Sequence, residues 1–168
     1  MKQEEVKDII EVLKRLADSE NPTIDLAKRQ QEKLLTCKNE QNTPVQWSIN
    51  KSQFYKGKIS LNCRLPNANI NILRLDTAPV NQHTNPSFKK GIVPDWLENY
   101  GGIVIKEQAH LHVYVESFPS LEWVVPLSDI SSFDVKSFEN LDDIVKVIVQ
   151  FARYIKLENE LNVLKPLL

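Results

Sequence analysis

The stretch KISLNCRL at residues 58–65 decides the fold class, because its side chains alternate strictly in polarity. Apolar side chains take every second position from Ile59 to Leu65, and polar side chains fill the positions between them. Successive side chains of a β-strand point to opposite faces, so the pattern predicts a strand with one buried and one polar face. The sequence PNAN at 66–69 predicts a turn, and residues 70–76 then predict the second strand of an antiparallel hairpin.

The same alternation recurs further along the chain, where residues 110–116 read HLHVYVE. The Leu and Val side chains are expected to face the core, and the His, Tyr and Glu side chains to face away from it. A further strand at 123–127 should lie at a sheet edge or end at Pro126, because Pro126 cannot donate to a neighbouring strand. Residues 77–102 between these strands predict a long loop, with a helical turn near 93–100, and loops of this length are usually functional.

Helical periodicity appears at both ends of the chain. Residues 6–17 predict a first helix, and residues 23–36 predict a second one that buries Ile24, Ala27 and Leu34. Residues 141–157 predict a last helix, which Asn140 caps. We therefore predict an α+β fold in which the N-terminal helices and the C-terminal helix pack on one face of an antiparallel sheet and leave the other face open.

Length and composition predict the domain organisation. The 168 residues and a hydrophobic fraction of 42% fit a single domain, 1–168, without disulfide or metal support. Within it we expect a helical part at 1–40, the sheet at 45–128 with its loop at 77–102, and the last helix at 137–158. Cys63 alternates with apolar neighbours and is expected to be a buried thiol.

Charge and hydropathy limit the class of protein and its cellular location. The net charge of −1 disfavours a protein that coats nucleic acid non-specifically. The N-terminus lacks the apolar core of a signal peptide, and no run reaches the roughly 20 apolar residues of a membrane span. These features predict a cytoplasmic protein with no membrane association.

The polar face of the predicted sheet collects the residues best suited to chemistry. All three histidines of the chain lie between residues 83 and 112. The residues predicted to be catalytic are Arg74, His83, His110, His112 and Tyr114. The residues predicted to bind a ligand on the same surface are Lys58, Arg64, Asp76 and Asn85.

One hypothesis for this surface is metal-free cleavage of RNA. The reaction needs a base for the 2′-hydroxyl, an acid for the leaving oxygen and a cation for the extra negative charge. Histidines titrate near working pH, and an arginine holds phosphate through two parallel bonds. A tyrosine can position the phosphate or replace one proton carrier. On this hypothesis we expect no cofactor and no stoichiometric metal.

Three alternatives remain open from the sequence. His110 and His112 point to the same side of a strand and form a metal site if Asp76, His83 or Glu116 completes it. The surface is a solvated sheet face if its groups do not act together. It is a recognition surface without catalysis if the same groups only bind a partner.

An ordered set of motifs resembles a small uncharacterised family of Gram-positive bacteria and their phages and mobile elements. The motifs are LRLD at 73–76, HTNP at 83–86, HLHVY at 110–114, and Trp123 with Pro126 and Leu127. The resemblance covers about residues 70–130, and it implies a role in defence, counter-defence or toxicity.

The leading hypothesis is therefore an accessory protein of a phage or mobile element that acts on RNA or a ribonucleoprotein, as a metal-independent ribonuclease. The alternative is a non-enzymatic, anti-CRISPR-like inhibitor that binds a protein or ribonucleoprotein target.

Overall fold

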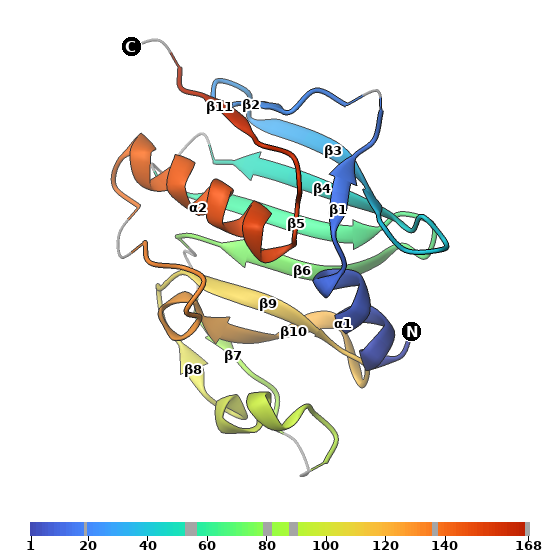
Figure 1. The fold of residues 1–168 in the computed structure, drawn as a ribbon. Helices are drawn as coiled ribbons and strands as arrows, with labels where there is room; N and C mark the ends of the chain where they lie inside the picture. Colours follow the sequence, from blue (N-terminus) through green and yellow to red (C-terminus); the bar gives the residue numbers. More distant parts are fainter. Residues whose placement is uncertain (19, 53–56, 79–81, 88–90, 136–137, 167–168) are drawn as a thin grey trace.

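The molecule is built on an antiparallel sheet of seven strands in the order β1-β3-β4-β5-β6-β9-β10 (Figure 1). The computed structural model describes residues 1–168 except 19, 53–56, 79–81, 88–90, 136–137 and 167–168. The strands are β1 (Lys14–Leu16), β3 (Gln30–Cys37), β4 (Pro44–Lys51), β5 (Ile59–Leu65), β6 (Ile70–Asp76), β9 (His110–Val115) and β10 (Phe118–Pro126). The predicted hairpin is confirmed as β5 and β6, and β10 lies at the sheet edge as its proline indicated.

Two helices cover one face of this sheet, which confirms the α+β class (Figure 1). They are α1 (Gln3–Glu11) and α2 (Leu141–Tyr154). The Asn140 side chain accepts a bond from the backbone N–H of Asp143 and so caps α2, as predicted. The apolar stripe of α2 packs on the inward side chains of the strands, where Phe151 stacks on Trp47 with ring centroids 6.0 Å apart.

The predicted helix at 23–36 is wrong. This segment contains β2 (Thr23–Asp25) and most of β3, so among the described residues of 1–40 only α1 is helical. On β3 the inward residues are Lys33, Leu35 and Cys37, while Leu34 is 41% exposed. Lys33 satisfies its buried ammonium by donating to the carbonyl of Asn21 at 2.7 Å. The inward lysine hides the two-residue period that would have predicted a strand.

The segment after β6 forms an appendage beside the edge strand β10 (Figure 1). It contains β7 (His83–Thr84), the 3-10 helix η1 (Asp95–Tyr100) and β8 (Val104–Ile105), and β7 pairs with β8. Of the loop predicted at 77–102, residues 79–81 and 88–90 lie outside the described residues. A second 3-10 helix, η2 (Leu127–Asp129), follows β10. Lastly, β11 (Asn162–Leu164) pairs in parallel with β2.

In the described part of the chain, neither α-helix has the length and apolarity required to cross a bilayer.

Candidate functional site

The pairing of β6 with β9 creates the candidate site on the face opposite the helices. Register places His112 directly across from Arg74, and His110 directly across from Asp76. The intervening residues, Leu75 and Leu111, pair with each other on the buried side. The alternation read from the sequence therefore brings these two cross-strand pairs onto one surface.

A bulge in β10 orients two of the three imidazoles. The ladder between β9 and β10 shifts register between Phe118 and Trp123, and within this bulge Leu121 has a φ of 55°. The carbonyl of Leu121 accepts a bond from Nδ1 of His112 at 2.8 Å. The next carbonyl, that of Glu122, accepts from Nε2 of His83 at 2.7 Å. An irregular strand thus fixes which nitrogen of each ring carries a proton.

The third imidazole is held in the same way. Nδ1 of His110 donates to the carbonyl of Gln108 at 3.0 Å, in the turn before β9. Its Nε2 lies 3.0 Å from Nε2 of His112. The ring of His83 packs edge-on against that of His112, with centroids 5.2 Å apart, and lies 6.0 Å from His110. The structure therefore brings all three histidines together.

Asp76 and Arg74 complete the cluster on β6. Oδ2 of Asp76 lies 3.2 Å from Nε2 of His112 and 2.7 Å from an amino group of Arg74. The same side chain of Arg74 reaches Nε2 of His112 at 2.9 Å. Burial alone would raise the pKa of Asp76, but the contact with His112 and the charge of Arg74 outweigh it, so the pKa lies below its usual range and the carboxylate is ionised.

The cluster is buried, which corrects the prediction of an open sheet face at this position. His110 and His112 are only 3% and 5% exposed. Burial and the neighbouring His112 lower the pKa of His110 to about 4, and burial also lowers the pKa of His83. His110 is therefore neutral at pH 7. The side chain of Arg74, which is 42% exposed, marks the side on which the cluster meets solvent.

No assignment of protons to His110 and His112 makes all the contacts of this cluster favourable. Carbonyl oxygens only accept, so Nδ1 of His110 and Nδ1 of His112 each carry a proton. If both rings are neutral, two Nε2 lone pairs face each other at 3.0 Å. If His112 is an imidazolium, its Nε2 proton goes to Oδ2 of Asp76 at 3.2 Å, but the charged ring then lies against the Arg74 guanidinium at 2.9 Å. If His110 is the imidazolium, it carries a charge that burial opposes. Each assignment leaves one unfavourable contact.

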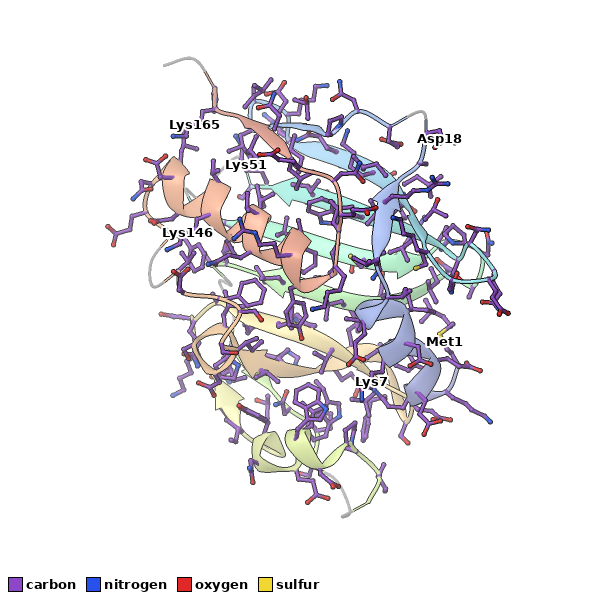
Figure 2. The ribbon with its side chains drawn as sticks, viewed as in Figure 1. Met1, Lys7, Asp18, Lys51, Lys146 and Lys165 are labelled. Atoms are coloured by element: carbon purple, nitrogen blue, oxygen red, sulfur yellow. The ribbon has the colours of Figure 1, made fainter. Side chains whose placement is uncertain are left out.

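Of the other residues predicted to be catalytic, Tyr114 lies apart from the histidines. Its ring belongs to the hydrophobic core, and its hydroxyl donates to the carbonyl of Met1 at 2.7 Å. Figure 2 labels Met1 at the N-terminal end of α1. The prediction that Tyr114 lies on the open polar face is wrong. A tyrosine at the end of a strand can pack its ring inward and still satisfy its hydroxyl at the rim.

The remaining predicted binding residues take three different positions. The Nε of Arg64 donates to the side chain of Gln46 at 2.6 Å, further along the polar face. Lys58 precedes β5, and its carbonyl accepts from the N–H of Ser52. Asn85 is buried, and its amide both donates to and accepts from the backbone of Val124, at 2.8 Å in each case. Asn85 thus continues the edge of β10 in place of a further strand and ties the His83 segment to it.

Sequence reasoning did not find the groups that orient the rings, because they are backbone carbonyls. Gln108, Leu121 and Glu122 contribute through their C=O groups, and no side-chain pattern predicts that role. The one signal in the sequence is the extra length between the strand at 110–116 and Trp123, which a bulge absorbs.

Fold and site together define an α+β protein with a buried His/Asp/Arg cluster on the helix-free face of its sheet. The chain belongs to a family of unknown function, DUF6978, which matches residues 1–157. The match extends well beyond the part that carried the resemblance and includes both helices. Neither a curated protein nor a solved structure gives a significant match.

Proposed function

We propose that this protein binds a divalent transition-metal ion through Nε2 of His110, Nε2 of His112 and the carboxylate of Asp76, and uses it for hydrolysis. One observation carries the proposal: two Nε2 atoms lie 3.0 Å apart while both Nδ1 atoms are committed to backbone carbonyls. A cation at this point resolves the conflict between the lone pairs. The proposal departs from the metal-free site expected from the sequence.

Two of the three separations between the ligand atoms fit a common ion. Ligand atoms about 2.0–2.2 Å from one ion at angles of about 90–110° are separated by roughly 2.8–3.6 Å. The two Nε2 atoms are 3.0 Å apart, and Oδ2 of Asp76 is 3.2 Å from that of His112. One ligand atom from each of the three residues lies within 4.8 Å of the others. Two histidines and one carboxylate form the facial set that suits Zn²⁺ or Fe²⁺.

The hydrogen bonds behind the ligands support the same proposal. A ligating histidine commonly donates its other N–H to a carbonyl or carboxylate, which fixes the tautomer and the ring plane. His110 and His112 both do so, through Gln108 and Leu121.

Three protein ligands would leave coordination positions for water, whose pKa such an ion lowers toward 7. His83 lies beside this position and is suited to carry the proton.

The test is metal binding by the purified protein. After dialysis against EDTA, Co²⁺ should bind at about one ion per chain and give visible absorption bands, and Zn²⁺ should displace it. His110→Ala and Asp76→Asn should each weaken binding by at least about 100-fold, more than loss of an outer hydrogen bond does. Glu32→Gln, a carboxylate elsewhere on the polar face, is the matched control and should bind as the wild type does. Undiminished binding by a His110→Ala/His112→Ala variant would refute the proposal.

A second candidate function is the metal-independent cleavage of RNA. The contact between Arg74 and Nε2 of His112 favours it, since it places a phosphate-binding cation beside a candidate base. Under this alternative, RNA is cleaved in EDTA, and His112→Ala slows cleavage by roughly 10²–10⁴-fold.

RNA or a ribonucleoprotein as partner, a cytoplasmic location and a role in phage or mobile-element conflict remain proposals drawn from the sequence. The alternative of an anti-CRISPR-like inhibitor predicts binding of a guide-RNA effector complex without cleavage.

A further inference from the structure

Arg74 is the member of the cluster whose position conflicts with a bound metal. Its amino group contacts Oδ2 of Asp76 at 2.7 Å and Nε2 of His112 at 2.9 Å. These are the atoms that the proposed ion uses, and the single lone pair on Nε2 of His112 cannot serve both a guanidinium and a metal. Two cations also repel at this separation. Occupation of the site therefore requires the guanidinium to move away from Nε2 of His112.

The displaced side chain has a short distance to travel. Arg74 is anchored on β6 directly opposite His112, and its side chain is already 42% exposed. It therefore remains beside the ion, on the side where solvent and ligands reach the cluster. A planar guanidinium next to a metal ion forms a pair of cations that an oxyanion can bridge, with two parallel N–H bonds from the arginine.

The charges of the occupied site indicate which oxyanion fits. The ion contributes +2, Arg74 contributes +1 and the ionised Asp76 contributes −1, while neutral ligand histidines contribute nothing. The sum is +2, in a cluster whose histidines are almost fully buried. A phosphate monoester carries close to two negative charges at neutral pH and balances the site. A carboxylate or a phosphate diester carries one negative charge and leaves about one positive charge of the site unneutralised.

We infer that the occupied site binds phosphate monoesters and that Arg74 is the residue that holds their phosphate group. This inference rests on the proposed metal site and adds its substrate class. Arg74 then has two positions. In the first it occupies the ligand atoms, and in the second it faces the substrate beside the ion.

The experiment measures two affinities in the same variants. Co²⁺ is titrated into metal-free protein, and inorganic phosphate is then titrated into the Co²⁺-loaded protein, both followed by the visible bands of Co²⁺. In Arg74→Gln, phosphate binding should weaken by at least about 10-fold, because a bidentate charge-assisted contact is lost. Co²⁺ affinity should stay equal or rise, because a competing cation has gone. Arg74→Lys should recover only part of the phosphate affinity, because lysine keeps the positive charge but lacks the two parallel N–H donors of the guanidinium.

Arg15→Gln is the matched control, because Arg15 is an exposed arginine on β1, at the edge of the same sheet farthest from β10. It should leave both affinities within about twofold of wild type. Acetate and a diester, bis(p-nitrophenyl) phosphate, should bind the wild type more weakly than phosphate does, and p-nitrophenyl phosphate should be the better substrate of the two esters.

The outcomes separate the two proposals. If Arg74→Gln binds Co²⁺ and also binds phosphate as the wild type does, the inference fails and the metal site stands. Stronger binding of the diester than of phosphate overturns the monoester class. If the wild type binds no Co²⁺, the metal site and this inference both fail.

Discussion

Two of the places where the molecule buries polar side chains are built in opposite ways. On the helix side, Lys14 is 1% exposed and its ammonium donates to the carbonyls of Ile10, Val12 and Ile155 at 2.8–3.0 Å. On the other side, the histidine cluster contacts groups that themselves titrate. Lys14 has three donors and three fixed acceptors, so nothing is left for a ligand. The cluster has mismatched protons and an exposed arginine.

Burial of a polar group therefore does not by itself indicate function. What distinguishes the two places is whether the contacts are complete. The ammonium of Lys14 links the end of α1 to the end of α2, although burial lowers its pKa. Its contacts are complete, and its role is to hold the helices together. The incomplete contacts of the histidine cluster support the proposed metal site.

The largest expected effect is on stability at Lys14. Lys14→Met should lower the free energy of unfolding by about 3 kcal/mol, because three buried carbonyls lose their donor while the cost of burying an ammonium is removed. Urea unfolding measures this value. Asp76→Asn on the other side should lower it by less, about 1–2 kcal/mol in EDTA, because Arg74 loses its ion pair but regains water. Equal losses at the two positions would contradict the distinction between them.

Metal binding should stabilise the protein through the histidine cluster alone. At a free Zn²⁺ concentration 100 times the dissociation constant, the gain is about 2.7 kcal/mol. That gain corresponds to a rise in Tm of roughly 5–10 °C for a protein of this size. His112→Ala should show no rise. The Lys14→Met variant should have a lower Tm without metal and should show the same rise in Tm with Zn²⁺ as the wild type, provided that the two places are independent.

A smaller effect is expected at Asn85, which joins the His83 segment to β10. Asn85→Ala removes both amide bonds to Val124 and should lower the free energy of unfolding by about 1–2 kcal/mol. Co²⁺ affinity should fall by less than about threefold, because His83 is not among the three proposed ligands. A large loss of metal would place His83 in the coordination shell. Hydrogen exchange at Val124 would report the loosened edge directly.

The smallest effect is expected at the thiols beside Lys14. Burial raises the pKa of Cys63 to about 12 and also raises that of Cys37, so neither forms a thiolate at pH 8. A thiol reagent should modify native protein only as fast as it unfolds. Lys14→Met should speed the modification by shifting the unfolding equilibrium, while metal-site variants should not. Rapid modification of the native wild type would contradict the closed packing.

The sequence predicted those parts of the fold in which periodicity is undisturbed. Residues 59–65 alternate cleanly and form β5. Residues 70–76 form β6, although Ile72 and Leu73 are both buried, and residues 141–154 form α2. It failed where a polar side chain points inward. Lys33 on β3 and Lys14 on β1 occupy buried positions, and both strands were read as parts of helices. No local pattern announces that distant carbonyls will satisfy a buried lysine.

The candidate site was predictable to the same degree. Alternation placed Arg74, Asp76, His110 and His112 on one face, and the register of β6 against β9 brings them into contact. The approach of His83 depends on where a long segment returns to the sheet, which is a property of tertiary structure. The direction of the imidazole nitrogens depends on a bulge with a residue at positive φ, and a single sequence does not reveal it.

The parallel pair of β2 and β11 has a consequence for how the chain reaches its folded state. Thr23 pairs with Asn162, and Lys14 is bridged to Leu157, so segments near opposite ends of the described chain depend on each other. Contacts at such long sequence separation form slowly, because closing a large loop is entropically unfavourable. During synthesis the segment around β2 and β1 must wait for residues 155–164 to emerge. Until then Ile24 and Leu26, which are buried in the folded protein, are not yet packed against that segment. During this interval the nascent protein exposes apolar side chains that favour aggregation and chaperone binding.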